Sequence, residues 1–245
     1  MFQFGTFQKI RTMSEYIDGF LTDREGWLLF QLARSCRIGC IVEIGSWQGK
    51  STVWIGLGTQ STSKLRVYAI DPHIGSKEHQ IHGQRIWTLK KFEENICRAG
   101  LKDIISPIVE FSENARYLFN QPISLLFIDG AHDYESVKKD YELWSPLVVD
   151  GGYVVFHDTQ QIGVKRVADS VLRNHCFRKV YFQDTICCGT KVLRRSLRDK
   201  FRAHKMIELK NKFMDVCAET THGSRRKRKW IKQWLKFKRT IMTVL

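Results

Sequence analysis

The hydrophobic residues of this chain form short apolar runs that alternate with longer stretches of helical spacing. The apolar runs predict seven strands, at 41–45, 66–71, 108–112, 124–129, 153–157, 179–182 and 189–193. The stretches between them predict helices at 51–57, 85–99, 134–147 and 164–172. Strands that are apolar throughout and alternate with helices are typical of a parallel sheet covered on both faces. We therefore expect a doubly wound, mostly parallel, seven-stranded α/β sheet of Rossmann-like type.

Helical segments flank this body on both sides. Residues 14–35 have helical spacing with a break at Thr22, and Glu25 three positions later completes the pattern of a capping box. Helical spacing returns at 194–211, where the alternation of strands and helices has stopped. We therefore assign a domain to residues 1–194, with a helical lead-in at 1–36, and a basic helical tail to residues 195–245.

The net charge of +15 is concentrated in this tail. From residue 191 onward the chain has 18 Lys or Arg and four Asp or Glu, whereas the preceding residues have 22 and 21. A cationic run at 225–229 leads into a helical stretch in which Trp230 and Trp234 share an apolar stripe. A basic helix with Trp on its apolar face is typical of helices that lie on an anionic membrane surface.

The amphipathic helix predicted at about 225–245 therefore favours peripheral attachment to a membrane. Docking of its apolar stripe on the domain or on a second copy of the chain is an alternative, and nucleic-acid binding is less favoured. Seven scattered cysteines match neither a disulfide framework nor a zinc ribbon. With no signal-peptide pattern and no run near the roughly 18 apolar residues of a membrane span, we expect a cytoplasmic protein at the inner membrane face.

The first predicted strand leads into a glycine-containing loop. Gly45 and Gly49 allow a tight turn and a close approach to a ligand at the start of the next helix. The spacing is one residue too short for a phosphate-binding P-loop, and Trp47 breaks the dinucleotide fingerprint. Glu43, an acid just before the first glycine, matches the loop of S-adenosylmethionine (SAM) enzymes. A purely structural strand-to-helix turn remains the alternative.

The second predicted strand ends in Asp71, 26 positions after Gly45. A carboxylate at this place can accept hydrogen bonds from both hydroxyls of a ribose. Alone, Asp71 is equally compatible with a helix cap. Together with Glu43 and the glycines it favours a cofactor that carries a nucleoside.

The fourth and fifth predicted strands end in acidic residues with a histidine beside each. Asp129 is followed by His132, and Asp158 is preceded by His157. Adjacent parallel strands lie roughly 5 Å apart, so Asp129 and Asp158 should face one crevice. Close carboxylates repel, which favours a proton or a cation between them, and such a site suits Mg²⁺, Mn²⁺ or Fe²⁺. The alternative is that these acids cap helices, as we expect for Asp133.

These strand ends together resemble a class I SAM-dependent methyltransferase. The chain is similar in particular to the small bacterial O-methyltransferases around macrocin O-methyltransferase and the cephalosporin hydroxylase-like proteins, and more distantly to catechol O-methyltransferase. The resemblance runs from about residue 17 to 193, and its most specific stretches are 126–137 and 151–159. It departs from catechol O-methyltransferase where Thr159 follows Asp158 in place of Asn, which leaves the third metal ligand open.

The resemblance implies roles for individual residues. SAM would be held by Glu43, Gly45, Ser46, Gly49, Asp71, Ser112 and Asp129, with Asp71 on the ribose and Ser112 near the adenine. A divalent cation, Mg²⁺ or another, would bind Asp129 and Asp158. His132 is the predicted general base, with Asp129 beside it, and His157 could replace His132 or bind metal.

The implied reaction is methyl transfer to a hydroxyl of a sugar, glycan or small-molecule acceptor. SAM carries its own electrophile, so the protein has to position the acceptor and handle its proton. Three alternatives stay open: a metal-dependent hydroxylase, a non-catalytic module that binds a membrane or a partner, and an RNA methyltransferase. A homo-oligomer is compatible with each of them.

Overall fold

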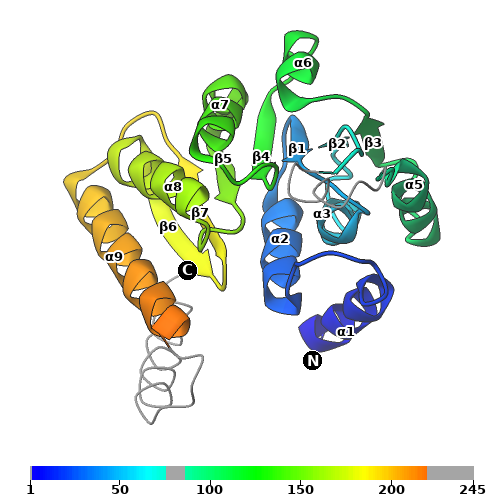
Figure 1. The fold of residues 1–245 in the computed structure, drawn as a ribbon, viewed down its shortest axis with the longest axis horizontal. Helices are drawn as coiled ribbons and strands as arrows, with labels where there is room; N and C mark the ends of the chain where they lie inside the picture. Colours follow the sequence, from blue (N-terminus) through cyan, green and yellow to red (C-terminus); the bar gives the residue numbers. More distant parts are fainter. Residues whose placement is uncertain (1, 76–85, 220–245) are drawn as a thin grey trace.

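The computed structural model describes residues 2–75 and 86–219. It contains the expected seven-stranded sheet, whose strands lie in the order β3-β2-β1-β4-β5-β7-β6 (Figure 1). The strands are β1 (Cys40–Ile44), β2 (Val67–Ile70), β3 (Ile105–Ile108), β4 (Ile123–Ile128), β5 (Val148–Phe156), β6 (Phe177–Gln183) and β7 (Ile186–Lys191). The first five are parallel, and β7 runs antiparallel to both of its neighbours. The prediction of a doubly wound, mostly parallel sheet is confirmed.

Helices cover both faces of the sheet because consecutive strand residues point to opposite sides. Ile41 packs in one core and Val42 in the other. One face is covered by α1 (Phe2–Ser14), α2 (Asp23–Ser35), α3 (Lys50–Gln60) and α5 (Leu89–Arg98). The other face is covered by α6 (Ser112–Tyr117), α7 (Tyr134–Trp144), the short 3₁₀ helix η1 (Ser145–Leu147), α8 (Ile162–Asn174) and α9 (Leu197–Glu219).

The helical lead-in differs in part from its prediction. The capping box is present, because the Glu25 amide donates to Thr22 Oγ1 at 3.3 Å and the Thr22 amide donates to Glu25 Oε2 at 2.9 Å. Residues 15–21 were expected to be helical, and this is wrong, since α1 ends at Ser14. Gly19 has a φ of +148°, and Lys50 donates a hydrogen bond to its carbonyl oxygen. The segment is therefore shaped by contacts with α3.

The third strand lies earlier in the chain than its prediction of 108–112. It pairs with β2 from Ile105 to Ile108, and Ser112 begins α6 instead. The strand can include Pro107 because it lies at the edge of the sheet, where a proline need not cost a ladder hydrogen bond. Pro107 interrupts the apolar pattern from which the strand was predicted.

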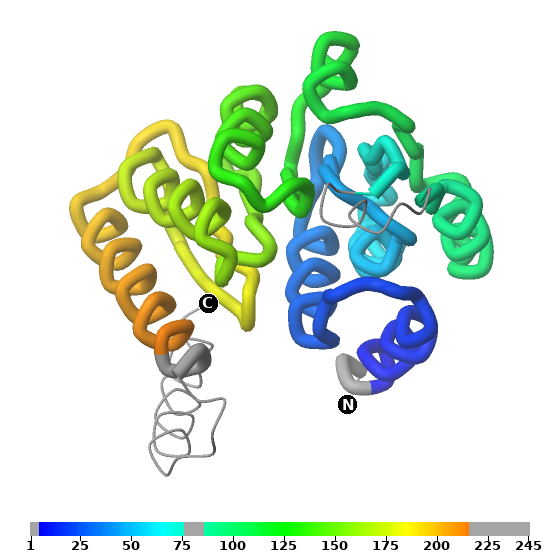
Figure 2. Tube along the Cα trace, in the orientation of Figure 1, coloured from blue at the N-terminus to red at the C-terminus, as the bar shows by residue number. Residues whose placement is uncertain are grey.

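The start of the predicted basic tail packs on the domain. Figure 2 shows α9 running beside α8 and the β6–β7 pair. Ala203 and Ile207 of α9 are buried, and the buried ammonium of Lys210 forms an ion pair with Asp169 of α8. The amphipathic helix predicted at about 225–245 lies outside the described residues. No helix within residues 2–75 and 86–219 is both long enough and apolar enough to cross a membrane.

Candidate active site

The carboxyl ends of β1, β4 and β5 lie side by side at one edge of the sheet. Ile44 of β1 is paired with Ile128 of β4, and Ile128 is paired with Phe156 of β5. The strand order reverses between β1 and β4, and ligands of doubly wound sheets bind at such a reversal. The loops that follow these three strands therefore form the candidate site.

The glycine loop after β1 passes directly over the end of β4. Gly45 has a φ of +84°, and a methyl group on it would overlap the Asp129 carbonyl oxygen. Gly49, with a φ of +90°, stands at the N-terminus of α3. Asp71 fixes the loop, because its Oδ2 accepts hydrogen bonds from the amides of Ser46 at 2.9 Å and Trp47 at 2.8 Å. Asp71 is therefore placed beside the loop, and whether it also binds a ribose stays a prediction.

Glu43 lies beneath this loop with its side chain fully buried. Its two carboxyl oxygens accept hydrogen bonds from Ser51 Oγ and Thr52 Oγ1, each at 2.5 Å. Burial raises the pKa of Glu43 to about 8, although the two hydroxyl hydrogen bonds lower it. The raised pKa favours the neutral form of this side chain near pH 7, and its two hydrogen bonds hold the first turn of α3 in place.

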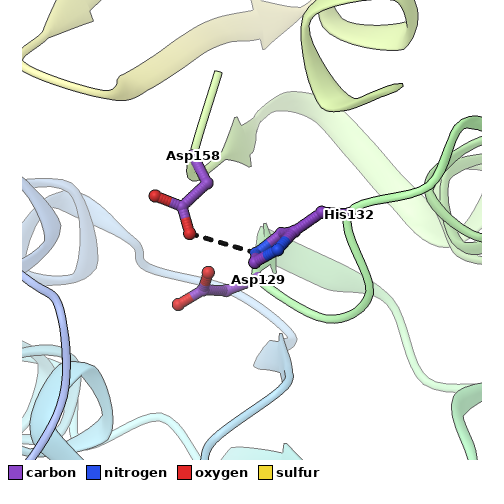
Figure 3. A group of neighbouring side chains, drawn as sticks. All are labelled: Asp129, His132 and Asp158. Carbon is purple, nitrogen blue, oxygen red and sulfur yellow. Dashed lines mark ion pairs between the residues drawn. The ribbon is translucent and has the colours of Figure 1, made fainter. Parts of the chain in front are cut away.

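Three side chains gather above the ends of β4 and β5 (Figure 3). Asp129, His132 and Asp158, here called the Asp–His cluster, each offer a ligand atom, and these atoms lie within 4.8 Å of one another. His132 Nε2 is 3.1 Å from Asp158 Oδ2. The side chains are 20%, 27% and 16% exposed, respectively, so the cluster is open to solvent. The predicted juxtaposition of Asp129 and Asp158 is present in the structure.

Two backbone features hold the cluster. Asp158 has a φ of +53°, in the left-handed region that residues other than glycine rarely occupy. Gly163, near the start of α8, has no room for a side chain because a methyl group would overlap the His132 carbonyl oxygen. The loop that carries His132 therefore lies directly on α8.

His157 lies behind the cluster, with its side chain only 3% exposed. Its Nδ1 is 2.8 Å from Asp129 Oδ1 and 3.5 Å from Asp158 Oδ2, and its Nε2 is 3.6 Å from Glu25 Oε2. Burial alone would lower the pKa of His157, but these carboxylates outweigh it and raise the pKa well above the ordinary value. These contacts favour the imidazolium form of His157, whose Nδ1 is in contact with Asp129, and both of its nitrogens face carboxylates.

The other predicted residues lie at the periphery. Thr159 is buried and donates from its hydroxyl to the Thr185 carbonyl at 2.7 Å, so it turns away from the cluster. The third side chain of the cluster that offers a possible metal-ligand atom is His132 instead. Ser112 Oγ donates to the carboxylate of Asp140, whose pKa burial raises to about 6. Whether Ser112 lies near an adenine stays a prediction.

Sequence reasoning did not find Glu25 as part of the site. The capping box with Thr22 was a sufficient local explanation for an acid at this position. The residues that it also contacts, His157 and Thr185, lie far away in the chain, the latter 160 positions from Glu25. No local pattern could have revealed these contacts.

Comparison with known proteins agrees with this arrangement. Residues 42–159, which contain the glycine loop and the Asp–His cluster, match the family model of a methyltransferase domain. Residues 42–159 are therefore similar to a methyltransferase domain, and the sheet that contains them has the fold of class I methyltransferases. The resemblance that the strand ends indicated is thereby confirmed, and the matched stretch ends at Thr159, directly after the cluster.

Relatives of the methyltransferase domain include proteins known by sequence and by structure. An uncharacterized protein of Acanthamoeba polyphaga mimivirus is 31% identical over 129 residues, which are 49% of this chain and 51% of that protein. The chain thus matches about half the length of this curated relative.

Two solved O-methyltransferases share the fold. One is TomG from Streptomyces achromogenes, in complex with SAM, at 14% identity and a TM-score of 0.55, with 77% of this chain and 88% of that chain covered. The other is from Bacillus cereus, in complex with SAH, at 17% identity and a TM-score of 0.54, with 76% and 91% covered.

Proposed function

We propose that this protein is a SAM-dependent methyltransferase that transfers a methyl group to a hydroxyl oxygen. One observation carries the proposal. The Asp–His cluster lies directly beside the glycine loop, so closely that Gly45 has no room for a methyl group against the Asp129 backbone. A methyl donor held at the loop and an acceptor held at the cluster would therefore be neighbours.

The chemistry of the loop supports SAM as the donor. Ser46 presents a buried hydroxyl that has no hydrogen-bond partner among the described residues. Such a group normally has a partner, so it points to a polar ligand. The neighbouring start of α3 adds free backbone N–H groups. Both solved O-methyltransferases named above hold SAM or its product SAH.

The cluster fits a divalent cation by its donor set. Two carboxylates and one imidazole suit Mn²⁺ or Fe²⁺ as well as Mg²⁺, and Asp129, His132 and Asp158 would hold the ion. A bound cation would lower the pKa of a coordinated hydroxyl. The donor set differs from the two histidines and one carboxylate of non-haem iron oxygenases, because both nitrogens of His157 face carboxylates. This favours methyl transfer over hydroxylation.

The residues themselves offer a route for the acceptor's proton. The imidazole of His132 is oriented by Asp158 at 3.1 Å and is exposed enough to meet a substrate. In a reaction without a cation, Nε2–H of His132 would donate to Asp158, the other ring nitrogen would accept the proton of the acceptor, and Asp158 would stabilise the imidazolium that forms. An imidazole that binds a cation is no longer a base near neutral pH, so His132 cannot have both roles. The cation requirement therefore decides which role it has.

The decisive experiment is a screen of sugars, glycans and small polyhydroxyl compounds with SAM labelled in its methyl group. Transfer of label to an acceptor oxygen supports the proposal, and binding of SAM without any transfer across hydroxyl acceptors argues for a non-catalytic module. EDTA treatment and Asp158→Asn should then abolish turnover if a cation is required. Turnover that survives EDTA but is lost in His132→Ala assigns the proton to His132.

SAM binding is tested separately by calorimetry. Asp71→Ala should weaken it because the loop amides lose their anchor. Glu15→Ala, on the exposed segment after α1, is the matched control and should bind SAM as the unchanged protein does. Equal affinity in Asp71→Ala and the unchanged protein would contradict the assignment of the loop.

A further inference from the structure

Glu25 connects the N-terminal helices to the candidate site. It lies in the first turn of α2, and its side chain is fully buried. Oε1 accepts hydrogen bonds from the amide of Thr185 at 2.7 Å and from its hydroxyl at 2.6 Å. Oε2 accepts from the Thr22 amide at 2.9 Å and lies 3.6 Å from Nε2 of His157. One carboxylate thus joins α2, the β6–β7 turn and the end of β5.

These contacts reach both residues that flank Asp158. His157 Nε2 is within ion-pair distance of Glu25 Oε2, although at 3.6 Å the two atoms form no hydrogen bond. Thr159 is linked through Thr185, whose carbonyl oxygen accepts from the Thr159 amide at 3.0 Å and from the Thr159 hydroxyl at 2.7 Å. The residue between them has the left-handed conformation, with a φ of +53°. Such a conformation persists where the surroundings fix it on both sides.

We propose that Glu25 is a positioning residue for the Asp–His cluster. It holds the 157–159 turn so that the Asp158 carboxylate stays directed at His132, and it holds the imidazole of His157 against Asp129. Glu25 touches no reacting atom itself. The inference rests on the proposed function only in taking the cluster as the site that binds a cation and an acceptor.

Glu25→Gln is the sharpest test of this role. The amide oxygen can still accept from Thr185, but its NH₂ group then faces the Thr22 amide and His157 Nε2–H, which are both donors. The contact with His157 is lost at nearly constant shape. Thr22→Ala is the matched control, because it removes the cap of the same helix turn and the hydroxyl bond to Asp184 but keeps the contacts of Glu25 with Thr185 and His157. Thr185→Val removes only the hydroxyl bond to Glu25 and is a milder second variant.

Two measurements are made on the full chain, hydrogen exchange of the 157–161 backbone and Mn²⁺ affinity by electron paramagnetic resonance. In Glu25→Gln we expect exchange of the Thr159 amide to accelerate and Mn²⁺ affinity to fall by about 10- to 100-fold, as for other partners of metal ligands. Thr185→Val should change both in the same direction by less. Thr22→Ala should lower stability and leave both unchanged.

Each result bears on the proposal. Unchanged exchange and Mn²⁺ affinity in Glu25→Gln would overturn it, as would equal changes in Thr22→Ala. If Glu25→Gln fails to fold, Thr185→Val takes its place, and unchanged exchange there overturns the proposal. If the unchanged protein binds no Mn²⁺, the cation site of the proposed function fails, while faster exchange in Glu25→Gln still supports the positioning role.

Discussion

The buried acid beneath the glycine loop should make the stability of this protein depend on pH in the neutral range. Glu43 is fully buried, and its pKa rises from 4.5 to about 8. The folded chain therefore keeps a proton that the unfolded chain has already released above pH 4.5. Because the folded state binds more protons, the free energy of unfolding must fall as the pH rises through this window.

Glu43→Gln isolates this contribution. The amide is neutral at every pH, nearly the same in shape, and can accept from one of the hydroxyls of Ser51 and Thr52 while donating to the other. Between pH 5.5 and 7.5 the wild type should lose about 1.4 kcal/mol per pH unit relative to the variant, or about 3 kcal/mol in all. Other titrating groups are common to both proteins, so they cancel in the difference.

Urea denaturation at the two pH values, followed by tryptophan fluorescence, measures this difference. Glu15→Gln, an exposed residue, is the control and should show no pH-dependent difference. A constant difference between wild type and Glu43→Gln from pH 5.5 to 7.5 would refute the reasoning, since it would mean that Glu43 is already ionised. Because a neutral Glu43 offers no charge to the SAM sulfonium, the variant should also keep its SAM affinity within about tenfold, or 1.4 kcal/mol.

Three further predictions concern Gly163, Glu25 and Lys210. Gly163→Ala should displace the His132 loop and lower methyl transfer while SAM binding persists, which kinetics and calorimetry would separate. Contacts with His157 outweigh burial and lower the pKa of Glu25 from 4.5 to about 2. The contribution of Glu25 to the free energy of unfolding is therefore present above pH 4.5 and is lost as the pH falls towards 2. Acid titration should show a smaller loss of stability in Glu25→Gln. Lys210→Ala removes the buried partner of Asp169, which keeps Asn211 and the partly buried Lys165, and should lower the free energy of unfolding by about 3 kcal/mol in urea denaturation.

The fold could be predicted where local pattern and burial agree. Strands such as β4, which is buried over its whole length, produce an apolar run that no loop would have. The prediction failed where contacts distant in sequence decide the conformation. Residues 15–21 have helical spacing, but Asp18 and Gly19 are held by hydrogen bonds from the glycine-loop region and α3.

The candidate site divides in the same way. Asp129 and Asp158 could be placed together because the carboxyl ends of adjacent parallel strands share one edge. The direction of a side chain could not be predicted, and Glu43 is an example: its carboxyl group accepts hydrogen bonds from Ser51 and Thr52, and its contact with a cofactor stays a prediction. Its partners Ser51 and Thr52 follow closely in the sequence. The sequence of the glycine loop does not indicate, however, whether an acid before the first glycine faces a ligand or the hydroxyls of the next helix.

The charge balance explains why the site needs the N-terminal helices. Three carboxylates, from α2, the end of β4 and the end of β5, surround the buried imidazole of His157 and favour its charged form. A buried charge is stable only with its partners in place, so the loss of any one of them destabilises the others. Glu25 supplies the partner that comes from outside the strand ends. The conformation of the Asp–His cluster at Asp158 is therefore expected to depend on a helix that begins 135 positions earlier, at Asp23.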